Sequence, residues 1–463
     1  MSQYLKLGDD LSPVQLVAHG DNGTFKVMGG CSWANADDEF NSEFLRSRIE
    51  PWLTALFQSE HLNLLVGAGL SSAIQESATG QRPQGMGWID DLKVCKSEID
   101  AYVEKTAKAA GREKGNIEDQ VRSINELIKG LEILVSLNPT PIPPPAPNPP
   151  YRYFPTELTA LREELSRCLK LFADSISNGE NLIRNAESEA KTKTFNYLVN
   201  FLMSFSSRAA TRDRLHIFTT NYDRIIEMGA ELAGLRLVDR FVGNIAPIFR
   251  SSRLEVDYHY NPPGIRGEPR YLEGVARFTK LHGSLDWYAS DGAIRRFGLP
   301  FGATSITPFL QAESAGAADY QQLMIYPNSV KDRETSEYPY VELFRDLASA
   351  TCRPNSTLVT YGYSFGDEHI NRVLLDMLTI PSTHIVIIAY GDPLGRIMNF
   401  IKDSGRKAQI SLLLGDHFGD LTTLVDCYLP KAAIDRTSIR MTELLKARGL
   451  YPESFQDKSG DKK

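Results

Sequence analysis

The chain has 463 residues, of which 42% are hydrophobic, 24% charged and 10% aromatic, and its net charge is −7. A length beyond the roughly 100–200 residues of one domain predicts two or three structural units. The composition excludes a largely disordered chain, and the acidic balance disfavours direct binding to nucleic acid.

Apolar runs such as His384–Ala389 have the length of buried strands, well short of the ~20 residues that span a bilayer, so no membrane helix is expected. The first residues lack the apolar stretch of a secretory signal, which predicts a cytoplasmic protein. The five cysteines are dispersed without a Cys-x-x-Cys pair. We therefore expect reduced, mostly buried thiols and no metal site.

Apolar runs bounded by turn residues predict the core strands. Residues 1–55 form an N-terminal extension with strand material around Gln15–Val27, whose role the sequence does not reveal. The first core strand is predicted over His61–Gly67, an apolar run that ends in glycine. Similar runs follow at Leu215–Thr219, Leu323–Tyr326, Thr357–Tyr361, Thr383–Ala389 and Gln409–Leu414, with helical patterns at Glu368–Leu378 and Pro393–Lys402. This alternation predicts an α/β fold with a doubly wound, Rossmann-like parallel sheet.

A long segment between the first two core strands, residues 76–211, is rich in Glu, Lys, Ala and Leu, which predicts a large helical insertion. Eight of the thirteen residues in 138–150 are proline, so this stretch is interpreted as an extended spacer, although a docking role for it stays open. The helical segments on either side are Ser97–Leu137 and Thr156–Arg208. The remaining divisions are a core at 56–75 and 212–450 and a flexible tail at 451–463.

A glycine turn follows the first core strand, with the sequence Gly67-Ala68-Gly69-Leu70-Ser71. Glycine lets the backbone approach a pyrophosphate, whose charge is met by amides at a helix start. Taken alone, the turn is equally well explained as a tight connection without a ligand.

A second polar motif, Thr219-Thr220-Asn221-Tyr222-Asp223, follows the second core strand. Asn221 offers both a donor and an acceptor, which suits a ribose hydroxyl, a water or a carboxamide, and Asp223 can orient its neighbours. The structural alternative is that Asn221 or Asp223 only caps the next helix.

Three further motifs complete the series. In Leu281-His282-Gly283-Ser284 the histidine is a candidate proton acceptor near neutral pH. In Gly362-Tyr363-Ser364-Phe365-Gly366-Asp367, Ser364 could bond a phosphate or ribose, while Asp367 is expected to cap the following helix. The last motif, Gly415-Asp416-His417, either contacts an adenine or merely ends its strand.

As an ordered set, these motifs resemble the sirtuin-like domains of bacterial anti-phage defence NADases, over about Leu62–Leu424 with the insertion excluded. The resemblance implies that NAD⁺ is the substrate and that Asn221 and His282 are catalytic. It assigns NAD⁺ binding to Gly67, Ala68, Gly69 and Ser71, and the adenosine half to Gly362 and Ser364. We add Thr220, Asp223 and Asp416 as candidate binding residues.

The sequence departs from the deacylase sirtuins in two places. Ser72–Glu76 replaces their Gly-Ile-Pro-Asp-Phe-Arg run, and their paired Cys-x-x-Cys zinc motif is missing. Water is therefore the expected acceptor, which predicts an NAD⁺ glycohydrolase that releases nicotinamide and ADP-ribose. The resemblance implies that such an enzyme acts as an abortive-infection effector. The alternatives are a catalytically silent nucleotide-sensing or DNA-associated subunit, or an NAD⁺-dependent deacylase. A nuclease using Asp223, Asp367 and Asp416 is weaker still, because no metal-ligand spacing supports it.

The resemblance also implies regulation of the activity. The regulation that it implies is through oligomerisation as a homo-oligomer, a nucleotide signal or a partner, for which a HerA-type ATPase is a candidate. The insertion and the N-terminal extension are the candidate regions for self-association.

Overall fold

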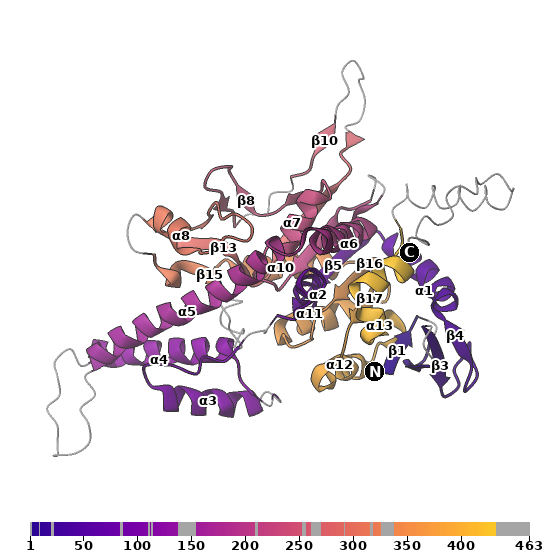
Figure 1. Cartoon of the computed structure of the whole chain (residues 1–463), viewed down its shortest axis with the longest axis horizontal. Helices are drawn as coiled ribbons and strands as arrows, with labels where there is room; N and C mark the ends of the chain where they lie inside the picture. The colour runs from indigo at the N-terminus through magenta and orange to yellow at the C-terminus, as the bar shows by residue number, and fades with distance from the viewer. Residues whose placement is uncertain are drawn as a thin grey trace, which may run out of the picture.

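The computed structural model (Figure 1) describes residues 2–8, 10–19, 23–83, 87–109, 112, 114–137, 154–208, 212–251, 256–260, 270–290, 292–314, 318–325 and 338–431. The predicted proline-rich spacer at 138–150 and the predicted tail at 451–463 lie outside the described residues.

A central eleven-stranded sheet organises the described part of the chain. Seven neighbouring strands are parallel, in the order β18-β17-β16-β5-β6-β12-β7. They are β5 (His61–Val66), β6 (Leu215–Thr219), β7 (Arg236–Val238), β12 (Val275–Lys280), β16 (Ser356–Tyr361), β17 (His384–Ala389) and β18 (Ile410–Leu414). The predicted α/β class with a mostly parallel sheet is confirmed.

Helices cover both faces of this sheet. Successive side chains of a strand point to opposite faces, so the apolar side chains of a buried strand need a layer of helices on each side. In β17, Val386 and Ile388 pack into one apolar cluster, whereas Ile385 and Ile387 pack into the other. The first layer holds α1 (Ser42–Phe57), α2 (Ala68–Thr79), α6 (Ser188–Ser206), α7 (Ile225–Leu232) and the π-helix η4 (Leu424–Tyr428); the second holds α10 (Tyr340–Thr351), α11 (Glu368–Leu378) and α12 (Arg396–Ser404).

The N-terminal residues extend the same sheet. The first strand pairs antiparallel with β18, and three more strands continue the meander to the sheet edge. They are β1 (Ser2–Lys6), β2 (Val14–Ala18), β3 (Thr24–Met28) and β4 (Glu39–Asn41). The strand material around Gln15–Val27 is thus a continuation of the core, which its own sequence did not reveal.

Between β5 and β6 the described residues contain five helices, so the predicted helical insertion is present. After α2 come α3 (Lys96–Ala109), α4 (Ile117–Leu137), α5 (Phe154–Arg184) and α6. Figure 1 shows α3, α4 and α5 as an arm that projects from one end of the sheet. This arm has its own apolar core, which includes Val103, Ile124, Leu161 and Phe172.

A smaller antiparallel sheet packs beside the arm, in the order β15-β13-β14-β9-β8. Its strands are β8 (Phe241–Val242), β9 (Ile248–Phe249), β13 (Gly283–Ser290), β14 (Ala293–Arg296) and β15 (Leu323–Ile325). The prediction that Leu323–Tyr326 is a strand of the core sheet is wrong, since β15 pairs antiparallel with β13. Three apolar residues fit either sheet equally well, so local pattern could not assign it.

Short elements complete the fold: β10 (His259–Tyr260), β11 (Arg270–Tyr271), α8 (Thr307–Ser314), η1 (Tyr320–Gln322), η2 (Pro393–Gly395), η3 (Lys407–Gln409), α13 (Asp416–Gly419) and α14 (Leu421–Thr423). All five cysteines are free; Cys168 is buried and the other four are half-buried. Within the described ranges, no helix is long and apolar enough to cross a bilayer.

Candidate functional site

The first four motifs meet at one edge of the parallel sheet. Val66 pairs with both Thr219 and Tyr361, and Thr219 pairs with Lys280. Because these residues end four adjacent parallel strands, the loops that follow them lie side by side. Ligands of open α/β sheets bind at this carboxyl edge.

Two glycine turns are packed backbone to backbone at this edge. The Gly67 amide donates to the Tyr361 carbonyl at 3.0 Å, and the Gly69 amide donates to the Gly362 carbonyl at 3.0 Å. A Cβ on Gly69 would lie 2.5 Å from the Gly362 Cα, and Gly362 itself has a φ of +61°. These glycines are therefore required by contact between two chain segments, whatever ligand they meet.

This packing reduces the number of backbone amides that remain available to bind a phosphate. The Gly67 and Gly69 amides already have carbonyl acceptors, whereas Ala68 is exposed at the first position of α2. A phosphate held by the start of α2 would therefore contact the turn at Ala68. Binding by the glycine turn stays a prediction.

Asn221, Ser71 and Asp223 form a directed hydrogen-bond relay. The Asn221 Nδ2 atom donates to the Gly67 carbonyl at 3.0 Å and to Ser71 Oγ at 2.9 Å, and Ser71 Oγ donates to Asp223 Oδ2 at 2.6 Å. The carboxylate accepts only, so Ser71 must donate to it and accept from Asn221. Both amide hydrogens of Asn221 are thereby used, which leaves its Oδ1 as the atom available to a ligand.

The helix-capping alternative holds for Asp223 and not for Asn221. Asp223 Oδ1 accepts from the Ile225 amide at 3.1 Å, at the start of α7. Asn221 is buried and its side chain makes no capping bond, which distinguishes it from an ordinary turn residue. Thr220 holds the loop through its backbone, since its amide donates to the Val66 carbonyl at 3.2 Å.

His282 is almost buried, with 9% exposure, directly after β12. Its Nε2 atom lies 3.7 Å from Asp367 Oδ2, and its ring lies 6.2 Å from the Tyr222 ring between centroids. Gly283 has a φ of +91°, and a Cβ there would meet the Met324 carbonyl at 1.9 Å, so only glycine fits the turn.

The sequence interpretation missed the role of Asp367. Asp367 occupies the N-cap position of α11, but its side chain makes no capping hydrogen bond there. The expected capping by its carboxylate is therefore wrong; the carboxylate lies beside His282 instead. An Asp just before a helix is typical of an N-cap, so the sequence predicts capping. Its position beside His282 depends on the tertiary fold.

The residues predicted to bind the adenosine half of NAD⁺, Ser364 and Asp416, do not form part of the hydrogen-bond relay of Asn221. Ser364 is exposed after β16. Asp416 accepts a hydrogen bond from Gln3 Nε2 of β1, and Gln3 Oε1 accepts from the His417 amide at 3.1 Å. The structure therefore does not join Asp416 to the relay, and its predicted binding role stays a prediction.

The insertion reaches the second motif through a buried ion pair. Glu180 of α5 and Arg224 form an ion pair at 2.5 Å, and Glu180 also accepts from the Arg224 amide at 2.8 Å. Phe172 of α5 packs edge-on against Tyr222. The loop that carries Asn221 is therefore held from outside the core sheet.

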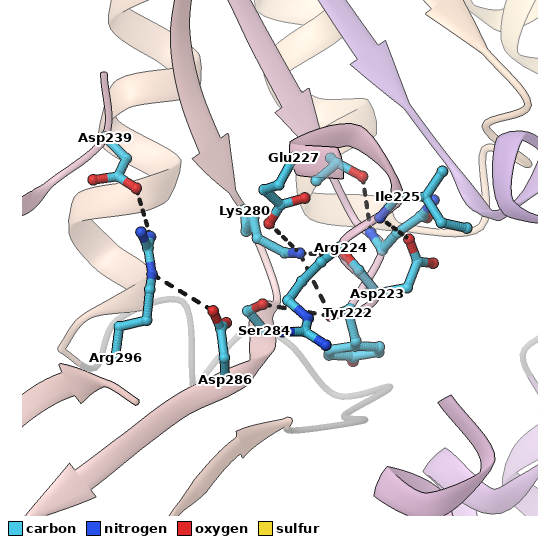
Figure 2. Close-up of polar contacts among 12 residues, drawn as sticks. Tyr222, Asp223, Arg224, Ile225, Glu227, Asp239, Lys280, Ser284, Asp286 and Arg296 are labelled. Atoms are coloured by element: carbon cyan, nitrogen blue, oxygen red, sulfur yellow. Dashed lines mark hydrogen bonds and ion pairs between the residues drawn. The ribbon is translucent and has the colours of Figure 1, made fainter. Parts of the chain in front are cut away.

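Lys280 also supports this loop (Figure 2), since its side chain reaches the backbone of Tyr222 and Asp223 and pairs with Glu227. Nearby, Arg296 pairs with Asp239 and Asp286. Over the part of the chain that the structure describes, no group of three or more His, Cys, Asp or Glu side chains could hold a metal ion.

Residues 215–408 match the family model of the SIR2-like domain. No curated protein matches the chain. The matched range contains Asn221, His282 and Ser364, whereas the Gly67–Ser71 turn precedes it in sequence and joins it in space. Residues 215–408 are therefore similar to a SIR2-like domain, and the Gly67–Ser71 turn lies beside them at the carboxyl edge of the sheet.

Proposed function

We propose that this chain is an NAD⁺ glycohydrolase that cleaves NAD⁺ to nicotinamide and ADP-ribose. The observation that carries the proposal is the relay from Asn221 through Ser71 to Asp223, which leaves Asn221 Oδ1 as an oriented acceptor at the carboxyl edge of a SIR2-like domain. His282 and Asp367 supply a histidine–carboxylate pair at the same edge.

The donors and acceptors of this edge fit NAD⁺. Ala68 at the start of α2 suits the pyrophosphate, and the exposed Ser364 after β16 suits the adenosine half. Asn221 Oδ1 suits a ribose hydroxyl or a water, because each can donate a hydrogen bond to it. The substrate would therefore lie along the edge, with its reactive bond near Asn221 and His282.

In the proposed reaction the bond between ribose C1′ and the nicotinamide nitrogen breaks, and its electron pair leaves with neutral nicotinamide. The oxygen of a water molecule bonds to C1′, and His282 accepts the proton that this water loses. Asp367 stabilises the positive charge that His282 then carries. Because the leaving group begins as a cation, no strong general acid is needed.

Single substitutions test this proposal. Asn221→Ala and His282→Ala are expected to lower kcat for nicotinamide release by about 100-fold or more, since each removes a group that acts on the reacting atoms. Asp376→Asn on the exposed side of α11 is the control and should retain wild-type kcat. Product analysis by chromatography should show ADP-ribose without any acylated peptide being added.

Two results separate this proposal from its alternatives. A silent nucleotide-sensing subunit would bind NAD⁺ without nicotinamide release, and its biological effect would survive Asn221→Ala. A deacylase would release nicotinamide only with an acylated peptide and would form an O-acyl product. Either result would refute the glycohydrolase assignment.

The resemblance also motivates the biological part of the proposal, an abortive-infection role carried out by a homo-oligomer or with a HerA-type ATPase. Wild-type cells should lose NAD⁺ after phage infection, and cells with His282→Ala should not. Nicotinamide release by the purified chain, with and without the product of the neighbouring gene, tests the partner. Light scattering of the same samples gives the oligomeric state.

A further inference from the structure

The loops that carry Asn221 and His282 are joined by backbone hydrogen bonds. The Leu281 amide donates to the Thr219 carbonyl at 2.8 Å, and the Leu285 amide donates to the Tyr222 carbonyl at 3.0 Å. One bond therefore lies before each candidate catalytic residue and one after it. The relative position of Asn221 and His282 depends on how firmly these two loops are held.

Lys280 adds an ionic brace to this backbone contact (Figure 2). Its side chain is 1% exposed, and its Nζ atom lies 3.5 Å from the Tyr222 carbonyl, contacts the Asp223 carbonyl and lies 2.9 Å from Glu227 Oε1. An ammonium has three donors, and three acceptors surround this one. The brace connects the end of β12, the loop of Asn221 and the first turn of α7.

We propose that Lys280 is a positioning residue for the reaction, which holds the Asn221 loop against the His282 turn through the Tyr222 and Asp223 carbonyls. The inference rests on the proposed function for its catalytic meaning. Lys280 contacts no reacting atom; it acts through Asn221, one residue before Tyr222. A shift of the loop by about 1 Å at a reacting group can cost roughly 100-fold in rate.

Glu227 balances the charge of this brace. Burial raises the pKa of the Glu227 carboxyl, and the neighbouring Lys280 opposes that shift. Its second oxygen, Oε2, is buried without a hydrogen-bond partner among the described residues. Removal of Lys280 alone would therefore leave a carboxyl without compensation, and that effect on stability must be separated from any effect on positioning.

The chain offers a matched control for a buried lysine. Lys6 of β1 is 0% exposed, and its Nζ donates to the Leu7 and Ile410 carbonyls at 3.1 and 2.9 Å. Like Lys280 it places a buried ammonium on backbone carbonyls, but these carbonyls belong to neither motif loop. Lys6→Met thus reports what the loss of such a lysine costs without any change at the site.

The experiment compares Lys280→Met, the double variant Lys280→Met/Glu227→Leu and Lys6→Met in the full chain. Lys280→Met should be less stable and lower kcat by about 10- to 100-fold, with the KM for NAD⁺ changed by less than about threefold. The double variant removes both charges, so its melting temperature should recover while its kcat stays low. Lys6→Met should retain wild-type kcat.

Hydrogen exchange supplies a readout that does not depend on catalysis. Amides in 219–224 and 281–285 should exchange faster in both Lys280 variants and should be unchanged in Lys6→Met. Recovery of kcat together with stability in the double variant would overturn the proposal, because Lys280 would then be only structural. Unchanged exchange in these two loops would also overturn it, whereas a wild type that never releases nicotinamide would refute the proposed function instead.

Discussion

The two ends of the carboxyl edge use polar side chains in opposite ways. Around β5, β6 and β12, the side chains of Ser71, Asn221 and Asp223 bond to one another across strands that are distant in sequence. Around β18, Asp416 instead bonds to Gln3 of the N-terminal strand.

His417 illustrates the second arrangement. Its ring is hydrogen-bonded to the Tyr428 hydroxyl at 2.7 Å, and burial lowers its pKa below the usual value. Its ring supports packing beside β18, where β1 joins the parallel strands. His282, at the other end, faces a carboxylate.

This difference shows how to tell candidate catalytic residues from structural ones at the carboxyl edge of the sheet. A polar residue there is a candidate for chemistry when its partners belong to other motifs and leave one of its atoms for a ligand, as in Asn221. A polar residue is structural when its hydrogen bonds go to the N-terminal strands that extend the sheet, as those of Asp416 do. Equivalent carboxylate-to-amide changes along the edge test this distinction.

Among these three carboxylate-to-amide changes, the largest effect is expected for Asp223→Asn. The two carboxylate oxygens accept from two different donors, Ser71 and the Ile225 amide, whereas an asparagine has only one acceptor oxygen, so Ser71 and Asn221 lose their fixed orientation. We expect kcat to fall by about 10- to 100-fold. Nicotinamide release measured over a range of NAD⁺ concentrations checks this, and wild-type kcat in this variant would show that the relay does not orient Asn221.

An intermediate effect is expected for Asp367→Asn. The change removes the negative charge 3.7 Å from His282 Nε2, so the protonated histidine loses stabilisation in the transition state. We expect kcat to fall by about 10-fold, a change of roughly 1.4 kcal/mol in the barrier. Asp376→Asn on the same helix is the matched control, and equal kcat for the two variants would contradict a role for Asp367.

The smallest effect is expected for Asp416→Asn. Gln3 Nε2 donates to Oδ1 of its carboxylate, so we expect Asp416 to add at most one hydrogen bond to the adenosine half. We expect an unchanged kcat and a KM for NAD⁺ raised by at most about fivefold, the factor for one hydrogen bond of roughly 1 kcal/mol. A loss of kcat as large as that of Asp223→Asn would erase the contrast between the two ends.

Most of the parallel core could be predicted because its strands are continuous apolar runs. β12 was missed, since Val275–Lys280 contains Arg277, Thr279 and Lys280 and does not resemble a buried strand. Its partner strands supply the missing information: β6 lies on one side of it and β7 on the other. The position of this strand also explains why His282 reaches the edge.

The sequence alone predicts where most of the core strands end and which polar residues follow them, because both depend on local hydrophobicity and on glycine. Gly67 and Asn221 are therefore candidates from the strands that they follow, whereas His282 is a candidate only from its own motif. Only the tertiary structure decided their partners: Asp223 for the relay, Asp367 for the histidine and Lys280 for the loops. These contacts join residues far apart in the chain, and their existence depends on strand order, which local patterns do not encode.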